Sequence, residues 1–400
     1  MRVLAINQFY APDEAATSQL LTDLCEDLAR GGDEVTVIAS QGYYLGGSRL
    51  PRSEVRNGVR VLRPFSTSFG KGSIPKRLAD YGTFFASAVA RAITVRRPDV
   101  VLALTTPPLI ATGALASASL RGIPLVAWVQ DVYPQIAVEL GVLDRHHPIT
   151  TLLDRAARIT YARSRRIVAL SSGMARRLEE LGAPGDRLRV IANWADGRAL
   201  VPRTSETSFR REHGLEGRFV VMYSGNLGAA HDVATFVEAA RKLENHRDVA
   251  FVFIGEGVRK PEAEKLAQGL GNVRFLPYQP RERLGESLGS ADVHLVGLRE
   301  GFEGLLVPSK VYGALACGKP VLFVGPSGCE VARLVREEGV GFATKPGDAE
   351  GVAEAIHRLA TDGELARRQG EKARRLFEEQ YDRPVAISHW RQVLAEAADL

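Results

Sequence analysis

Short apolar runs alternate with longer amphipathic stretches along most of this chain. The run RVLAI covers residues 2–6, a second run covers residues 34–38, and leucines recur at helical spacing over residues 20–28 between them. This order predicts a strand, a helix and a second strand, which together form a βαβ unit. Ligands of such units bind at the carboxyl ends of the strands. Residues 8–18, which follow the first run, are therefore expected at the binding edge.

The same alternation predicts two successive α/β domains. Further strands are expected at residues 59–63, 100–104, 125–129, 167–170, 189–191, 219–223, 249–254, 273–276, 293–296 and 321–324. A length of 400 residues suits two domains of about 200 residues each. We predict two doubly wound, Rossmann-like domains, with the boundaries 1–196 for the first domain, 197–217 for a polar hinge, 218–380 for the second domain and 381–400 for a C-terminal helix that could pack on the first domain.

The second half opens with a strand, a glycine-bearing turn and a helix between Phe219 and Leu243. An apolar run meets the turn SGNLG, and the helix that follows carries apolar residues at i, i+3, i+4 and i+7. Gly225 and Gly228 would let a phosphate approach the backbone amides next to a helix N-terminus. The alternative is an ordinary turn capped by Asp232. Because the chain begins with a similar unit, we expect a ligand cleft between two such halves.

Composition and charge restrict the classes of partner. Hydrophobic residues make up 45% and charged residues 25% of the chain, as in soluble globular proteins. Residues 1–190 carry a net charge of +7 and the remainder carries −2. A basic first half favours an acidic substrate or an anionic membrane surface, and the spread of its charge disfavours nucleic acid. Three cysteines without CxxC spacing disfavour a disulfide framework or a zinc site.

The uncharged stretch from Val100 to Leu120 is long enough to cross a bilayer. It also contains the sequence TTPP, so a buried strand, a turn broken by proline and a buried helix are the favoured interpretation. Met1 leads directly into an apolar strand, which argues against a cleaved signal. We therefore expect a cytoplasmic protein.

Several ordered motifs give the chain a specific resemblance. NQFYAPDEAATSQ near the start, TTPPL, VQDVYPQ, SGNLG, IGEG and VPSKVYGALACGKPVLFVG occur in this order over nearly the whole length. The chain resembles family 4 glycosyltransferases of the two-domain GT-B fold, and most closely the bacterial branch that assembles O-antigen, capsule and exopolysaccharide, including N-acetyl-fucosaminyl and colanic-acid type enzymes. The resemblance implies a nucleotide-sugar donor, with UDP favoured, on the second domain and a saccharide or polyprenyl-linked acceptor on the first. It also implies retention of configuration, and no metal or other cofactor.

By that resemblance, the stretch from Gly304 to Pro320 forms the centre of the donor site. A diphosphate leaving group needs cations and hydrogen-bond donors, and Lys310 and Ser309 can supply them. The alternative is a solvated lysine beside a capping serine. Many relatives carry two glutamates here, at positions occupied in this chain by Leu305 and Gly313. Glu303 is a further catalytic candidate that could approach the donor sugar. The remaining donor-site candidates are Gly225, Asn226, Arg259, Lys260, Tyr278, Gly304, Leu305, Tyr312 and Glu330.

On the first domain, Asp131 follows a predicted strand and is the candidate for activating an acceptor hydroxyl. It could instead only fix the turn before Tyr133. Glu14, Ala15 and Thr17 are expected on the acceptor side of the cleft.

Basic residues near apolar ones suggest contact with the inner face of the plasma membrane. Lys71, Lys76 and Arg77 precede a helix containing Phe84 and Phe85, and five arginines crowd residues 155–166. A solvated arginine face is the alternative. Two other functions stay open at this point: a nucleotide-sugar epimerase of related architecture, and a non-catalytic scaffold that has lost the paired glutamates.

Overall fold

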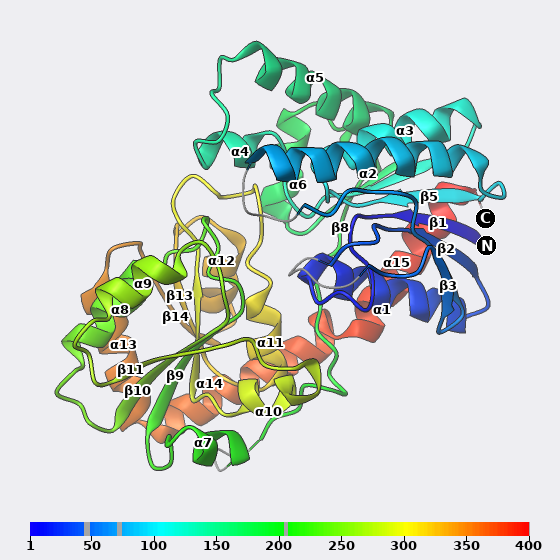
Figure 1. The fold of residues 1–400 in the computed structure, drawn as a ribbon. Coiled ribbons are helices and arrows are strands. Elements are labelled where there is room, and N and C mark those ends of the chain that lie inside the picture. The colour runs from blue at the N-terminus through cyan, green and yellow to red at the C-terminus, as the bar shows by residue number, and fades with distance from the viewer. Residues whose placement is uncertain (44–48, 70–73, 204–206, 400) are drawn as a thin grey trace. The chain divides into compact units, whose positions relative to one another are not determined.

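The computed structural model describes residues 1–43, 49–69, 74–203 and 207–399. The chain divides into two compact units (Figure 1). The first unit contains Met1–Ala192, Gly304–Leu306 and Ile387–Leu400, and the second contains Asn193–Glu303 and Val307–Ala386. Each unit is built on its own sheet, so each is described separately.

The sheet of the first unit has the order β3-β4-β2-β1-β5-β6-β7-β8 in the described part of the chain. All neighbours are parallel except β3 and β4. The strands are β1 (Arg2–Ile6), β2 (Glu34–Ile38), β3 (Ser53–Arg56), β4 (Val59–Leu62), β5 (Val100–Ala103), β6 (Leu125–Trp128), β7 (Arg166–Ala169) and β8 (Leu188–Val190). The order of strands reverses between β1 and β5, which makes their carboxyl ends a topological switch point.

Helices cover both faces of the first sheet because its parallel strands are apolar on both sides. The helices along the chain are α1 (Ala16–Arg30), α2 (Ile74–Thr94), α3 (Ile110–Leu120), α4 (Gln135–Glu139), α5 (Pro148–Arg163) and α6 (Ser172–Glu180), followed by the 3₁₀ turn Gly185–Arg187. Helices α2, α3 and α5 lie side by side on one face (Figure 1). Phe84 of α2 and Ile110 of α3 pack there against Leu4, Ile6 and their neighbours on the sheet.

The last helix, α15 (Arg383–Ala398), contributes its residues from Ile387 onward to the first unit. Trp390 is fully buried, and its ring centroid lies 4.5 Å from that of Trp128 on β6. Arg391 donates to the backbone oxygen of Asp27 in α1 at 2.8 Å. The end of the chain is therefore part of the core of the first unit.

The sheet of the second unit has the order β11-β10-β9-β12-β13-β14 in the described residues, with every pair parallel. Its strands are β9 (Phe219–Ser224), β10 (Val249–Ile254), β11 (Val273–Leu276), β12 (Val293–Gly297), β13 (Val321–Val324) and β14 (Gly341–Thr344). In chain order this is the Rossmann arrangement 3-2-1-4-5-6, with its switch point between β9 and β12.

The helices of the second unit bury the predicted apolar stripe. They are α7 (Ser208–Glu212), α8 (Ala234–Lys242), α9 (Lys260–Leu266), α10 (Leu284–Gly289), α11 (Lys310–Ala316), α12 (Glu330–Glu337), α13 (Ala349–Thr361) and α14 (Gly363–Leu376), with a 3₁₀ turn at Arg281–Arg283 and a π-helical turn at Phe377–Tyr381. Val233, Phe236, Val237 and Ala240, which the sequence places on one helix face, are all buried in one cluster with β9 and β10.

Two predictions about segments have clear outcomes. The predicted hinge at residues 197–217 belongs to the second unit, because Phe209 and Leu215 are buried against β9 and β10 and only part of the segment is exposed. The uncharged stretch at 100–120 forms β5, a turn and α3, as the favoured interpretation predicts. Among the described residues, no helix combines the length and apolarity needed to span a membrane.

Candidate functional site

Two glycine turns interlock at the carboxyl edge of the second sheet. The amide of Gly225, after β9, donates to the oxygen of Ile254 at 2.8 Å, and the amide of Leu227 donates to that of Glu256 at 2.8 Å. Gly255 has a φ of +130°, and a Cβ there would lie 2.3 Å from the oxygen of Gly225. The turns SGNLG and IGEG can therefore pack this closely only because glycine stands at the contact.

The side chain of Lys310 lies across this glycine surface. A Cβ on Gly225, whose φ is +126°, would lie 2.9 Å from Cε of Lys310. The ammonium nitrogen is 5.1 Å from the ring centroid of Tyr223, which is itself buried in β9. The strand end, the turn and the first residue of α11 thus place one cation at the switch point between β9 and β12.

His231 fixes the position of that cation. Its Nδ1 lies 2.7 Å from the oxygen of Gly297, at the end of β12, so Nδ1 carries the proton and donates it. Nε2 is then an acceptor, and it lies 3.3 Å from Nζ of Lys310. Burial, reinforced by the lysine charge, lowers the pKa of His231 to about 3, which keeps the imidazole neutral.

Lys310 has no ion-pair partner among the residues that the structure describes. Burial lowers the pKa of its ammonium from 10.5 to about 7, because the charged form loses water and gains no carboxylate in return. A cation held in this way is a ready site for an anion. The structure thus brings Lys310 and the Gly225 turn together, and the predicted role of Lys310 in holding a diphosphate stays a prediction.

The two other predicted cations, which flank the same turns, are already paired. Arg259 forms an ion pair with Glu262 at 2.9 Å, and Lys260 forms one with Glu256 at 2.7 Å. Both follow the IGEG turn, and the amide of Arg259 donates to the oxygen of Leu227 at 3.0 Å. The structure brings them to the edge of the site but not into contact with Lys310.

Tyr278 and Asn226 lie directly on the two turns. A Cβ on Gly255 would be 3.2 Å from Cε1 of Tyr278, and one on Gly257 would be 2.7 Å from Oδ1 of Asn226. Asn226 is exposed, and its backbone oxygen accepts the hydroxyl proton of Tyr223 at 2.9 Å. These two predicted donor-site residues are therefore grouped with Gly225.

The residues around α11 and α12 divide into exposed and buried positions. Ser309 is the N-cap of α11, and its hydroxyl makes no capping hydrogen bond. Glu303 is exposed, and Glu330 is the first residue of α12, where a carboxylate stabilises the positive end of the helix. Tyr312 is fully buried, with its ring 5.1 Å from that of Tyr381. Its ring therefore packs in the interior, and its predicted role in donor binding stays a prediction.

Gly304 and Leu305 differ from the prediction. Both were expected beside Lys310, yet they belong to the first unit. The oxygen of Leu305 accepts the amide proton of Val132 at 2.9 Å, and its side chain is buried. Leu305 is thus a packing residue of the first unit, and this backbone bond follows directly after Asp131.

Asp131 lies at the carboxyl edge of the first sheet, just beyond β6. Its amide donates to Oγ1 of Thr105 at 3.3 Å, and its side chain borders a cavity of about 20 Å³ that Tyr133 and Thr160 also line. Burial raises the pKa of this carboxyl to about 6. Among the described residues, the carboxylate has no cation paired with it.

The loop after β1 is held by a residue that sequence reasoning did not select. Asp13 is buried, and its Oδ1 accepts the amide proton of Ala15 at 2.8 Å. Glu14 is exposed, while Ala15 is the N-cap of α1 and Thr17 lies in its first turn. All three predicted residues therefore lie at the expected strand end.

Sequence reasoning gave His231 and Gly297 no role. They are 66 residues apart, and only the pairing of β9 with β12 brings them together. A histidine three residues after a glycine turn carries no signal of its own. The glycine that ends an apolar strand at 293–297 was the one available indication of a close approach.

Family models match both halves of the chain. The model described as "Glycosyl transferase 4-like domain" matches residues 17–194, and the model described as "Glycosyl transferases group 1" matches residues 205–376. Together they cover the second sheet, all of the first sheet except β1, and both Asp131 and Lys310.

Relatives and solved structures extend over nearly the full length. The chain is 30% identical to the probable glycosyltransferase WbjE of Pseudomonas aeruginosa over 361 residues, which is 90% of this chain and 89% of the relative. It is 25% identical to the putative colanic acid biosynthesis glycosyl transferase WcaI of Escherichia coli (strain K12), over 90% of this chain and 92% of the relative. Anabaena HepE in complex with UDP-glucose superimposes with a TM-score of 0.72 at 17% identity, over 99% of both chains.

Proposed function

The chain belongs to the family 4 glycosyltransferases of the GT-B fold, and on that premise we propose that it moves a sugar from a UDP-linked donor to a saccharide or lipid-linked acceptor. The observation that carries the donor half is the geometry at Lys310, whose half-buried ammonium lies beside a glycine turn with a neutral histidine as its partner. As the glycosidic bond breaks, negative charge grows on the diphosphate, and a fixed cation stabilises that charge.

A UDP donor is favoured by a structural neighbour. HepE, which shares the fold, has been solved with UDP and with UDP-glucose. In this chain Tyr278 lies on Gly255 beside the turn, where its ring could border a base. We propose that Lys310 and the backbone amides of the turn hold the diphosphate, so that transfer needs no divalent ion, and that the anomeric configuration is retained.

For the acceptor, we propose that Asp131 orients a hydroxyl and accepts its proton. A carboxylate whose pKa is about 6 is ionised at neutral pH and is a better base than an exposed one. The cavity of about 20 Å³ beside it has room for roughly one water molecule and not for a sugar ring, so the acceptor would approach Asp131 from outside this cavity. The acceptor class is inferred from relatives such as WcaI, whose description refers to colanic acid biosynthesis.

We also propose that the first unit rests on an anionic membrane surface from the cytoplasmic side. Lys76, Arg77 and Leu78 are exposed on α2, and Leu78 is 62% exposed. Phe84, which was expected in this surface, is buried in the core, and Lys71 lies outside the described residues. Attraction between basic residues and anionic lipid weakens with salt. Co-sedimentation with phosphatidylglycerol vesicles at low salt supports the proposal, and its absence there refutes it.

The test of function is a panel of UDP-, GDP- and dTDP-sugars offered to the full-length protein with a mixture of saccharide and polyprenyl-phosphate acceptors. Transfer from a UDP-sugar, with the same rate in EDTA, is the expected result. Isomerisation of the donor without acceptor would identify an epimerase instead. A protein that binds none of these nucleotides by calorimetry would be a scaffold, and the proposal would then be rejected.

A further inference from the structure

A second basic site lies in the first unit at the amino ends of β1, β2 and β4. The parallel register sets Leu4, Thr36 and Arg60 side by side in one row, and Ile6, Ile38 and Leu62 form the next row. The second row is buried beneath α2. The first row lies where α2 ends at Thr94: Leu4 is buried in the same core cluster as α2, whereas Arg60 is exposed. The last turn of α2 and the residues that follow it therefore border an opening above Thr36 and Arg60.

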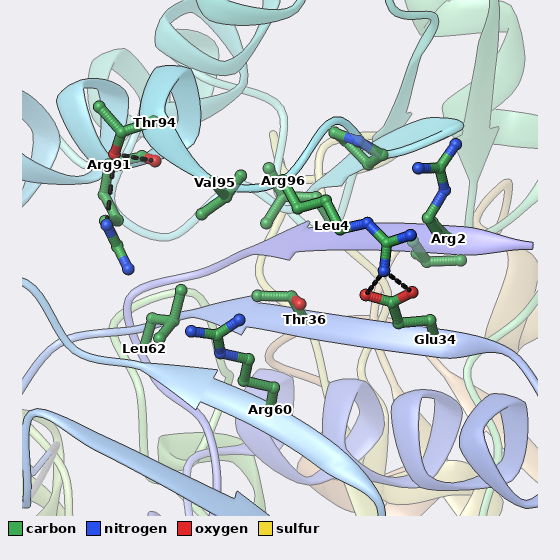
Figure 2. Close-up of a pocket in the computed structure, with 12 residues that line it drawn as sticks. Arg2, Leu4, Glu34, Thr36, Arg60, Leu62, Arg91, Thr94, Val95 and Arg96 are labelled. Carbon is green, nitrogen blue, oxygen red and sulfur yellow. Dashed lines mark hydrogen bonds and ion pairs between the residues drawn. The ribbon is translucent and has the colours of Figure 1, made fainter.

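This opening is a cavity of about 120 Å³ lined by four arginines, Arg2, Arg60, Arg91 and Arg96 (Figure 2). Figure 2 shows Arg60 lying over the sheet beside Thr36, and Arg91 reaching down from the end of α2. The four side chains come from three different segments of the chain. Only the folded unit therefore brings them together.

Two of these arginines are neutralised and two are not. Arg2 pairs with Asp99 at 2.7 Å, and Arg96 pairs with Glu34 at 3.0 Å. For Arg60 and Arg91, no carboxylate partner occurs among the described residues; Arg91 donates only to Oγ1 of Thr94, at 3.3 Å. The pocket therefore carries two guanidinium groups in excess of its carboxylates.

The end of helix α2 does not account for this excess. Basic side chains often gather at a helix C-terminus to satisfy its last carbonyl groups. Here Arg121, which does not line the cavity, donates to the oxygens of Ala92 and Val95 at 2.7 and 2.8 Å. Arg60 and Arg91 are thus left available for a ligand.

We propose that this pocket binds a phosphate group. Guanidinium groups match the tetrahedral oxyanion with paired hydrogen bonds, and one anion between two like charges relieves their repulsion. The hydroxyl groups of Thr36 and Thr94 line the same cavity and can add hydrogen bonds. The cavity is smaller than the roughly 300 Å³ that sites for drug-sized ligands require, so it suits a single phosphate rather than a nucleotide.

The test is calorimetric titration of the full-length protein with inorganic phosphate and, separately, with glycerol 3-phosphate, against chloride at equal ionic strength. We expect each ligand to give a heat of binding with the wild type. We expect the same with Lys310→Ala, a variant that removes the cation of the second unit. The double variant Arg60→Gln/Arg91→Gln should bind at least about tenfold more weakly, because charged hydrogen bonds are lost. The matched variant Arg155→Gln, at an exposed arginine on α5, should bind as the wild type does.

The two ligands separate the sources of the phosphate. Binding of inorganic phosphate alone assigns the pocket to the free ion, and tighter binding of glycerol 3-phosphate assigns it to a phosphate ester. No heat with either ligand up to about 20 mM, or equal binding by the double variant, overturns the proposal; that concentration is well above the millimolar range that such weak sites reach. Circular dichroism of each variant verifies that the fold is intact.

Discussion

Asp131 in the first unit and Lys310 in the second are opposite in charge and alike in surroundings. Asp131 follows the end of β6 in the first sheet, and Lys310 begins α11 beside the turn that follows β9 in the second. Neither has an ion-pair partner among the described residues. Burial is the only cause of either pKa shift, upward to about 6 for Asp131 and downward to about 7 for Lys310. Desolvation alone thus moves the pKa of each group close to 7.

The two sites differ in how the charged atom is held. Lys310 is fixed by His231 and by contact with the Gly225 turn, whereas the carboxylate of Asp131 borders a small cavity. A fixed cation suits an anion that always arrives in the same place, such as a diphosphate. The carboxylate of Asp131 has no comparable side-chain partner among the described residues. The two charged groups therefore differ in how firmly their neighbours hold them.

The largest effect is expected from removing the cation. Lys310→Ala should reduce kcat/KM for transfer by about 1,000-fold, because the charge on the leaving diphosphate is no longer stabilised. Steady-state assays with the donor found in the panel measure this. Lys345→Ala, at an exposed lysine of the same unit, should leave the rate unchanged. An active Lys310→Ala enzyme would contradict the assignment.

Removing the carboxylate of Asp131 should affect activation of the acceptor hydroxyl rather than binding of the donor. Asp131→Asn keeps the size of the side chain but cannot accept a proton, so we expect kcat to fall about 100-fold while donor affinity is retained. Calorimetry with UDP separates the two quantities. Asp186→Asn, at an exposed position of the same unit, serves as the control. Loss of UDP binding in Asp131→Asn would show that this residue serves the donor instead.

The pH profile should report both groups. Lys310 loses its charge as the pH rises through about 7, and Asp131 loses its charge as the pH falls through about 6. We expect kcat/KM to be highest between these values and to fall about tenfold per unit on either side. Lys310→Arg should remove the alkaline fall, since a guanidinium stays charged. A profile that is flat from pH 5 to 9 would show that neither group titrates in the reaction.

A smaller effect is expected from a substitution at Gly225, in the turn beneath Lys310. Gly225→Ala places a Cβ 2.9 Å from Lys310 Cε at a φ of +126°. We expect donor affinity to fall about tenfold and stability to fall by about 1 to 3 kcal/mol, because the backbone is strained. Gly271→Ala, where a Cβ meets nothing within 4 Å, is the matched control. Denaturant unfolding and UDP calorimetry measure the two changes.

The smallest effect concerns stability alone. The ammonium of Lys310 has a pKa near 10.5 in the unfolded chain and about 7 in the folded protein. Between pH 7 and pH 10.5 the unfolded state therefore binds more protons than the folded state does. Stability should therefore rise with pH across this window and be lowest below pH 7. At pH 6, Lys310→Met should raise Tm by about 2 to 4 °C, since a buried charge is removed. A lower Tm would show that Lys310 stabilises the fold.

The periodic features of the fold could be predicted from the sequence. The apolar stripe from Val233 to Ala240 and the strand runs depend on local spacing, and each appears where expected. Lys310 and Asp131 were found because motifs and strand ends mark them. The partner of Lys310 was missed because His231 and Gly297 meet only through pairing of distant strands.

The surroundings of three other predicted residues also depend on long-range contacts. The family resemblance over residues 304–320 placed Gly304 and Leu305 in the donor site with Lys310, yet these two residues belong to the first unit, where the oxygen of Leu305 accepts the amide proton of Val132. Tyr312, two residues after Lys310, points into the interior because successive helical residues face different directions. Sequence proximity to a catalytic candidate is thus a poor guide to which unit a loop joins.

Trp390, whose ring packs at a tilt of 53° against that of Trp128 in the core of the first unit, is synthesised 200 residues after the last strand of that unit's sheet. Domains usually fold in the order in which they leave the ribosome. Here the core of the first unit lacks Trp390 until the second unit has been synthesised, so the first unit cannot complete its core before then. Removal of residues 387–399 would therefore disrupt the core of the first unit rather than that of the second.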